Sequence, residues 1–123
     1  MKFQPITPII RTHKIEKTID FYCKTLGFIC GEKKDDWNWA SLHKDDCEIM
    51  IANPNEHTPF DKPFFSGSFY IKVDDVDKLW YSLKDNVKVC YEIETFEWGM
   101  REFAIYDNNG YMLQFGQDMT QFL

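Results

Sequence analysis

Acidic and histidine side chains are the first candidates for chemistry in this sequence. Glu48 and Glu102 have the right type to act as a general acid and base, but such a pair must lie close together, which a sequence cannot show. His13, His43 and His57 fall at two predicted strand ends and in a loop, without a neighbouring nucleophile. We therefore predict surface histidines and no catalytic residues. A metal-free enzyme remains an alternative.

Aromatic side chains offer a second chemistry, the recognition of a flat or cationic ligand. Trp37 and Trp39 lie two residues apart, so they are predicted to share one face of a strand and to present ring surfaces. Ordinary strand packing explains the same pair equally well. Trp98 falls in a turn, where it can cap a cavity mouth or anchor a dimer. Trp80 lies on the apolar face of a predicted helix and is expected in the core.

The elements that must position these residues form two similar halves. The first half reads as strand 6–12, helix 15–26 and strands 28–32, 37–43 and 47–52. The second half reads as strand 69–73, a helix capped by Asp75, and strands 87–94, 101–106 and 111–115. Asn108-Asn109-Gly110 is a hairpin-turn sequence between the last two strands.

The repeated order predicts an internal duplication of a βαβββ module. A proline-rich stretch separates the two halves, so we place module one at residues 1–53, the connection at 54–67 and module two at 68–123. A chain of 123 residues is expected to be a single domain.

Several of these segments resemble one known superfamily, the glyoxalase, bleomycin-resistance and extradiol-dioxygenase (vicinal oxygen chelate) proteins. The stretch 20–28 (DFYCKTLGF) resembles the family's helix-to-strand signature, and 98–116 (WGMREF, then DNNGY, then QFG) is similar to the closing hairpin of bleomycin-resistance-like members. Residues 69–76 resemble the strand and helix start of the second half. The resemblance covers nearly the whole chain. It implies an α+β fold in which two βαβββ modules form an open, cup-shaped mixed sheet with helices outside.

The resemblance also locates the metal site of the family's enzymes, which takes four residues, usually His, Gln or Glu. The corresponding positions here are Thr7, Met50, Ser68 and Gln114, of which only Gln114 is a plausible ligand. An uncharged set offers little to offset the desolvation of a dication. We therefore expect no metal and no cofactor, and none of the metal-dependent activities of the family.

Strand alternation divides the side chains between a helix-covered face and the face lining the cup. Pro8, Ile10, Thr12, Cys47, Ile49 and Ile51 are predicted to pack under the helices. The predicted ligand-binding residues are Trp37, Trp39, Glu48, Met50, Ser68, Tyr70, Trp98, Met112 and Gln114. Arg101 is expected to form a salt bridge with Glu48 or Glu102, with a ligand anion as the alternative.

The composition limits which partners the protein can bind. The formal charge of −6 and the absence of a Lys/Arg cluster argue against nucleic-acid binding and favour a cationic ligand. No segment has the apolar length of a signal peptide or membrane span, so we expect a cytoplasmic protein without membrane contact. Eleven phenylalanines are a heavy apolar load, and we expect a homodimer in which Phe60, Phe64 and Phe65 contribute to the interface.

The leading functional hypothesis is a binding protein that sequesters a small, partly aromatic ligand or antibiotic in a metal-free cavity. Drug resistance is one role that such binding can serve. The alternative is a metal-dependent lyase or dioxygenase of the same superfamily with an atypical ligand set. A sensor or accessory module without turnover would use the same cavity, and the sequence does not separate it from the first hypothesis.

Overall fold

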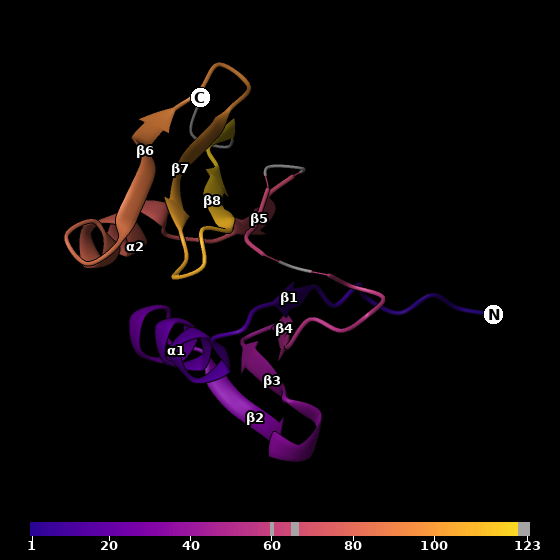
Figure 1. Cartoon of the computed structure of the whole chain (residues 1–123). Helices are drawn as coiled ribbons and strands as arrows, with labels where there is room; N and C mark the ends of the chain where they lie inside the picture. The colour runs from indigo at the N-terminus through magenta and orange to yellow at the C-terminus, as the bar shows by residue number, and fades with distance from the viewer. Residues whose placement is uncertain (60, 65–66, 121–123) are drawn as a thin grey trace. The chain divides into compact units, whose positions relative to one another are not determined.

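The chain forms two compact units, Met1–Lys62 and Pro63–Leu123 (Figure 1). The structure, a computed structural model, describes residues 1–59, 61–64 and 67–120. Each unit has its own four-stranded sheet and its own helical segment within these ranges. No helix in the described ranges is long and apolar enough to cross a membrane.

The first unit follows the predicted order of elements. These elements are β1 (Ile9–Arg11), α1 (Ile15–Asp20), the π-helical turn η1 (Phe21–Thr25), β2 (Ile29–Lys34), the 3-10 turn η2 (Asp35–Trp37), β3 (Trp39–Lys44) and β4 (Cys47–Ala52). β1 is shorter than predicted, because Pro8 has no N–H to donate to the sheet and only its carbonyl accepts, from the Met50 N–H. The helical segment stops where Gly27 adopts a φ of 80°, a conformation that favours glycine.

The sheet of the first unit has the order β1-β4-β3-β2, with β1 parallel to β4 and the other pairs antiparallel. Ile10, Leu42 and Ile51 are fully buried beneath the helical segment together with Tyr22. Ile9, on the other face of β1, keeps 46% of its surface exposed. The predicted alternation between a covered and an open face is therefore confirmed in this sheet.

The second unit repeats the first. Its elements are β5 (Phe69–Lys72), α2 (Val76–Leu83), β6 (Lys88–Thr95), β7 (Met100–Tyr106) and β8 (Met112–Asp118), and its sheet order is β5-β8-β7-β6. The strand orders of the two sheets correspond position by position, again with one parallel pair, β5 and β8. The predicted α+β fold of two βαβββ modules is confirmed.

The apolar core of the second unit lies between α2 and its sheet. The Trp80 ring packs on Phe103 with centroids 5.1 Å apart, and Phe103 stacks on Phe115 at 5.3 Å. Trp80 is 8% exposed, which confirms that it is a core residue. Since Phe103 points toward α2, its neighbour Glu102 must point to the opposite face of β7.

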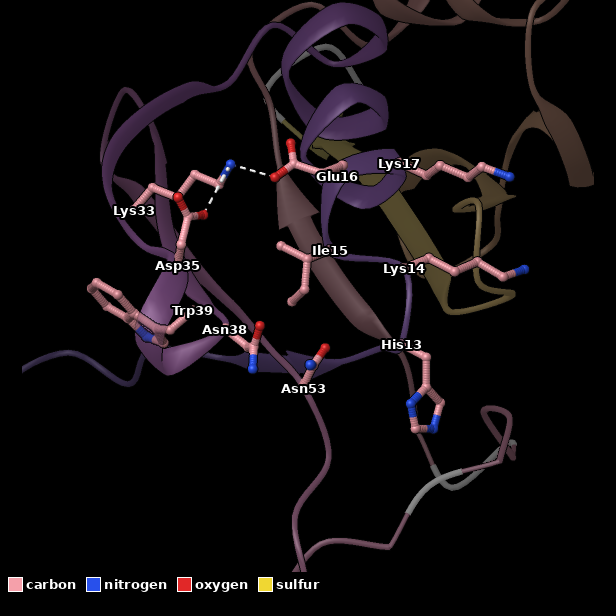
Figure 2. Close-up of a pocket in the computed structure, with 10 residues that line it drawn as sticks. All are labelled: His13, Lys14, Ile15, Glu16, Lys17, Lys33, Asp35, Asn38, Trp39 and Asn53. Atoms are coloured by element: carbon pink, nitrogen blue, oxygen red, sulfur yellow. Dashed lines mark hydrogen bonds and ion pairs between the residues drawn. The ribbon is translucent and has the colours of Figure 1, made fainter.

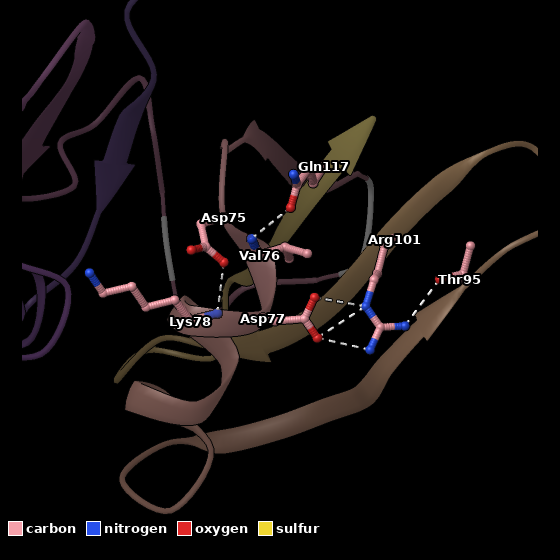
Figure 3. Close-up of polar contacts among 7 residues, drawn as sticks. All are labelled: Asp75, Val76, Asp77, Lys78, Thr95, Arg101 and Gln117. Carbon is pink, nitrogen blue, oxygen red and sulfur yellow. Dashed lines mark hydrogen bonds and ion pairs between the residues drawn. The ribbon is translucent and has the colours of Figure 1, made fainter. Parts of the chain in front are cut away.

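Polar contacts fix the start of α2 on this sheet (Figure 3). The Asp75 carboxylate accepts from the Lys78 N–H at 3.2 Å, which confirms the predicted N-cap. The Gln117 side chain on β8 accepts from the Val76 N–H at 3.0 Å, so a second unpaired amide of the helix end is satisfied.

Arg101 on β7 completes this attachment. Its Nε and Nη2 atoms donate to the Asp77 carboxylate at 2.9 to 3.1 Å (Figure 3). A salt bridge was expected, but within the second unit its partner is Asp77 and not the predicted Glu102. Arg101 lies on the helix face of its strand, where the first turn of α2 brings a carboxylate that the sequence does not place.

The structure changes one further expectation and leaves another untested. Trp37 belongs to η2 and precedes Asn38, which adopts a left-handed φ of 49°, so Trp37 and Trp39 do not share a strand face as predicted. Phe60 and Phe65 lie outside the described residues, while Phe64 is 77% exposed. The homodimer stays a prediction.

The ion pair between Arg101 and Asp77 generates a test of stability. The hydrogen bond from Arg101 lowers the pKa of Asp77, so the pair stabilises the fold above the ordinary aspartate pKa and is lost as the pH falls through the lowered one. Asp77→Asn should reduce the free energy of unfolding by about 1 kcal/mol near pH 7, a modest value because the carboxylate is 44% exposed. Urea unfolding from about pH 7 to about pH 3 should show the two proteins converging. Asp74→Asn is the control, and an equal loss there would contradict the assignment.

Candidate functional site: a buried carboxylate among aromatic rings

A buried carboxylate marks the open face of the second sheet. Glu102 on β7 is only 3% exposed. Its Oε1 accepts from the Tyr70 hydroxyl at 3.1 Å and from the Trp98 indole N–H at 3.2 Å, and its Oε2 accepts from the Tyr91 hydroxyl. No Lys, Arg or His in the described ranges lies within ion-pair distance of it. The charge is therefore held by neutral donors alone.

The hydrogen-bond network continues toward β5. The Gln114 amide on β8 donates to the Tyr91 hydroxyl at 2.9 Å, and its carbonyl oxygen accepts from the Ser68 hydroxyl. Ser68, Tyr70, Trp98 and Gln114 were predicted as ligand-binding residues, and the structure joins all of them through Glu102. Their actual part in ligand binding is untested.

A glycine allows Tyr70 to reach this carboxylate. Gly116 on β8 is the register partner of Glu102 and lies between β5 and β7 in the sheet. A Cβ atom at Gly116 would stand 2.0 Å from the Tyr70 hydroxyl oxygen. The absent side chain therefore opens the path along which Tyr70 crosses β8. Glycine inside a strand is a recognised sign of such a close approach, so Gly116 is the sequence signal from which this crossing could be predicted.

Tyr91 reaches the same face because β6 is irregular. The pairing of β6 with β7 shifts between Val89 and Tyr91, so Val89 pairs with Ile105 while Tyr91 pairs with Ala104. Without this bulge, Val89 and Tyr91 would point the same way, under α2. Simple alternation therefore misses Tyr91, which was not among the predicted site residues.

The two tyrosines are held in their neutral form. Burial, and then the hydrogen bond to Glu102, raise the pKa of Tyr70 to about 12 and the pKa of Tyr91 to about 12. Both hydroxyls therefore remain hydrogen-bond donors to the carboxylate across the physiological pH range.

An aromatic cluster stands beside this network. Phe96 and Trp98 stack in the β6–β7 turn with centroids 4.6 Å apart and planes inclined by 7°, and Tyr91 meets Phe96 edge-on at 5.9 Å. The turn closes through Gly99, whose N–H donates to the Phe96 carbonyl at 3.0 Å and whose φ is 89°. Trp98 stays 60% exposed although its indole N–H is bound.

These groups surround an open pocket of about 620 Å³ within the second unit. Its lining residues are Tyr91, Glu92, Ile93, Glu94, Phe96, Trp98, Glu102 and Gln114. Three of them are carboxylates and none is a cation. The unit as a whole has the same bias, because residues 63–123 contain ten Asp and Glu against five Lys and Arg. The pocket can thus offer negative potential and ring faces to a ligand.

The first unit carries a smaller polar network. Glu48 on β4 accepts from the Thr7 hydroxyl at 3.1 Å and from the Ser41 hydroxyl at 3.0 Å, and Ser41 also contacts His43 Nε2 at 2.9 Å. The Ser41 hydroxyl donates its proton to Glu48 and not to the His43 imidazole. A serine nucleophile activated by a histidine base would instead donate to the imidazole. All three histidines of the chain are exposed, as predicted.

The predicted tryptophans Trp37 and Trp39 both line one pocket of the first unit, and Trp39 also borders a second. Trp39, Asn38 and Asn53 border two pockets of about 390 and 460 Å³, the first of which is drawn in Figure 2. Trp37 lines only the second, beside Arg11. In the first, Lys33 pairs with Glu16 and Asp35, and Lys14 and Lys17 also line the pocket, so acidic side chains are not in excess there (Figure 2).

The two remaining predicted residues are methionines. Met50 is half-buried on β4 and pairs with Ile9, while Met112 borders a pocket of about 320 Å³ in the second unit, apart from the Glu102 network. Within each unit, the predicted site residues thus lie in more than one place, and their part in ligand binding stays a prediction.

The metal-ligand positions of the family do not suit a divalent ion. Thr7 and Ser68 supply hydroxyls that donate to Glu48 and Gln114, Met50 supplies a thioether, and Gln114 supplies an amide. Divalent ions bind most strongly where imidazole or carboxylate donors are present, and none of these four residues supplies one. In the described part of the chain, no three His, Cys, Asp or Glu side chains are placed to hold a metal ion.

The comparisons with known proteins agree with this fold. The Glyoxalase/Bleomycin resistance protein/Dioxygenase superfamily profile matches residues 3–115, so the chain belongs to this superfamily. The expected family is thereby confirmed. A search of curated proteins gives no significant match.

Solved structures of low sequence identity share the fold. The antibiotic binding protein TnmS3 from Streptomyces sp. CB03234 has 21% identity and a TM-score of 0.78, with 96% of this chain and 98% of that chain covered. The bleomycin-binding protein from Streptomyces verticillus, complexed with copper(II)-bleomycin, has 22% identity and a TM-score of 0.69, covering 94% and 96%. Lactoylglutathione lyase from Agrobacterium tumefaciens has 15% identity and a TM-score of 0.73, covering 93% and 92%. The neighbours thus include both binding proteins and an enzyme.

The crossing of Tyr70 over Gly116 predicts a specific mutational effect. Gly116→Ala should displace Tyr70 from Glu102 and lower the free energy of unfolding by about 1–3 kcal/mol, through the clash and the lost hydrogen bond. Urea unfolding measures this loss. In a Tyr70→Ala background the obstacle is gone, so the same substitution should cost less than about 0.5 kcal/mol. Equal losses in both backgrounds would refute the crossing.

Proposed function

We propose that this protein binds a small, partly aromatic organic cation in the pocket over Glu102 and sequesters it without chemical turnover and without a metal. The observation that carries the proposal is the Glu102 carboxylate, which is 3% exposed and lacks a cationic partner among the described residues. Burying a charge is costly unless it is compensated, and a cationic ligand would supply the missing opposite charge.

The surroundings of Glu102 support this ligand class. Trp98 and Phe96 offer ring area on one side of the pocket, and Glu92 and Glu94 add negative charge at its exposed rim. Two structural neighbours are named as binding proteins for antibiotics, which is in keeping with a binding role for this fold. In the part of the chain that the structure describes, no group of side chains has comparable support as a metal centre.

Ligand charge and the buried carboxylate are tested in turn. In a panel of aromatic ammonium ions, aromatic carboxylates of matched size and copper(II)-bleomycin, only the cationic compounds should raise the melting temperature, because only they are attracted by the carboxylates. Glu102→Gln should weaken the best cation about tenfold or more in calorimetry, since a charged hydrogen-bonded site loses its charge.

The matched control is Glu97→Gln, which removes an exposed carboxylate from the same turn but does not line the pocket. It should leave the affinity nearly unchanged. Stabilisation by carboxylates as strong as by ammonium ions, or no stabilisation by any cation, would contradict the proposed function.

Metal content separates the proposal from the enzymatic alternative. Protein purified without chelator should contain far less than one zinc, iron, manganese or nickel ion per chain, because thioether, hydroxyl and amide donors bind these ions weakly. Elemental analysis by mass spectrometry gives the measurement. Near-stoichiometric metal, together with an isomerase, lyase or dioxygenase activity that chelation removes, would establish the alternative.

A further inference from the structure

We propose that this pocket recognises positive charge through ring faces and surrounding carboxylates rather than through a salt bridge, so that its ligand class is an aromatic compound bearing an N-methylated, quaternary ammonium group. This inference rests on the proposed function and names the cation that the same pocket would take. It follows from how Glu102, Trp98 and the rim glutamates are arranged.

Glu102 is poorly placed to accept an N–H from a ligand. A carboxylate has about four lone-pair positions, and three of them already accept from Tyr70, Tyr91 and Trp98. With 3% of the residue exposed, the remaining position has almost no access from the pocket. Glu102 therefore acts on a ligand mainly through its field, which does not require the ligand to carry a hydrogen-bond donor.

Trp98 is well placed to meet a cation. Its indole N–H donates to Glu102 at 3.2 Å, which fixes the orientation of the ring. The bonded anion also polarises the indole, so that the ring becomes more electron-rich. Phe96 covers part of the ring by stacking, yet 60% of Trp98 remains exposed. Tryptophan is the strongest side-chain partner for a cation over its face, and quaternary ammonium groups are typical ligands of aromatic pockets.

Hydration distinguishes the possible cations. A primary ammonium is a compact, strongly hydrated charge with three donors, and it must exchange these water contacts for acceptors in the site. Among the carboxylates that line the pocket, Glu92 and Glu94 are exposed at its rim, whereas Glu102 is buried and already accepts three hydrogen bonds. A trimethylammonium group is more weakly hydrated and has no donors to satisfy, so it loses less on entering among the rings.

Three probes with one aromatic scaffold test this preference. They are tyramine, its N,N,N-trimethylammonium derivative, and 4-(3,3-dimethylbutyl)phenol, the neutral carbon analogue of the second. Titration calorimetry should show the trimethylammonium probe binding roughly tenfold more tightly than the neutral analogue, and several-fold more tightly than tyramine. The pair that differs only in nitrogen and carbon isolates the charge, because shape and apolar area are matched.

Substitutions test which side chains recognise the positive charge. Trp98→Leu should remove most of the preference for the trimethylammonium probe over the neutral analogue, because the ring face is lost. The double substitution Glu92→Gln and Glu94→Gln should lower the affinity for both cations several-fold and leave the affinity for the neutral probe unchanged. Because both residues are exposed, this variant does not disturb the buried network. Glu97→Gln again serves as the control and should change none of the three affinities.

The outcomes separate the two proposals. Tyramine binding as tightly as the trimethylammonium probe, or more tightly, would overturn the inference and leave cation binding standing. Equal affinity of the trimethylammonium probe and its neutral analogue would overturn charge recognition at this pocket, and failure of both cations to bind would overturn the proposed function together with the inference.

Discussion

Burial of the Glu102 carboxylate is the constraint on which the second unit depends. A carboxylate that is 3% exposed needs compensating donors, and they come from three separate parts of the chain: Tyr70 on β5, Tyr91 on β6 and Trp98 in the β6–β7 turn. Each donor requires a local departure from regular structure. Tyr70 needs a glycine beneath it, Tyr91 needs a bulge, and Trp98 needs the turn that closes at Gly99. The carboxylate thus links the irregular features of this sheet.

One strand serves both the fold and the site. Along β7, Arg101 and Phe103 face α2. Arg101 forms the ion pair with Asp77, and Phe103 packs on Trp80. Glu102, between them, faces the pocket. The alternation of a strand makes these roles inseparable, since a shift of the register by one residue would exchange the two faces. The ion pair and the stacked rings on the helix side therefore also hold the carboxylate in its position on the open side.

The local patterns of the sequence predict the fold well, and the site only in part. Hydrophobic periodicity and the Asp75 cap depend on neighbouring residues, so the order of helices and strands could be derived before the structure was known. Contacts such as Arg101 with Asp77 depend on how α2 docks, and Tyr91 reaches the site through a bulge that alternation does not reveal. Ser68, Tyr70 and Gln114 were predicted from the family resemblance and strand alternation, and Trp98 from its place in a turn; their part in ligand binding stays a prediction.

The two units show how a duplicated scaffold can hold different chemistry. In each, a hydroxyl preceding the first strand donates to the last strand, from Thr7 to Glu48 and from Ser68 to Gln114. Among the described residues, a carboxylate that is both deeply buried and hydrogen-bonded to aromatic side chains, Glu102, occurs in the second unit alone. The second unit also carries most of the acidic excess. Residues 1–62 hold nine Lys and Arg against ten Asp and Glu, whereas residues 63–123 hold five Lys and Arg against ten Asp and Glu. Because like charges raise the cost of burying another carboxylate, an anionic unit that nevertheless buries Glu102 gains most from a ligand that brings positive charge.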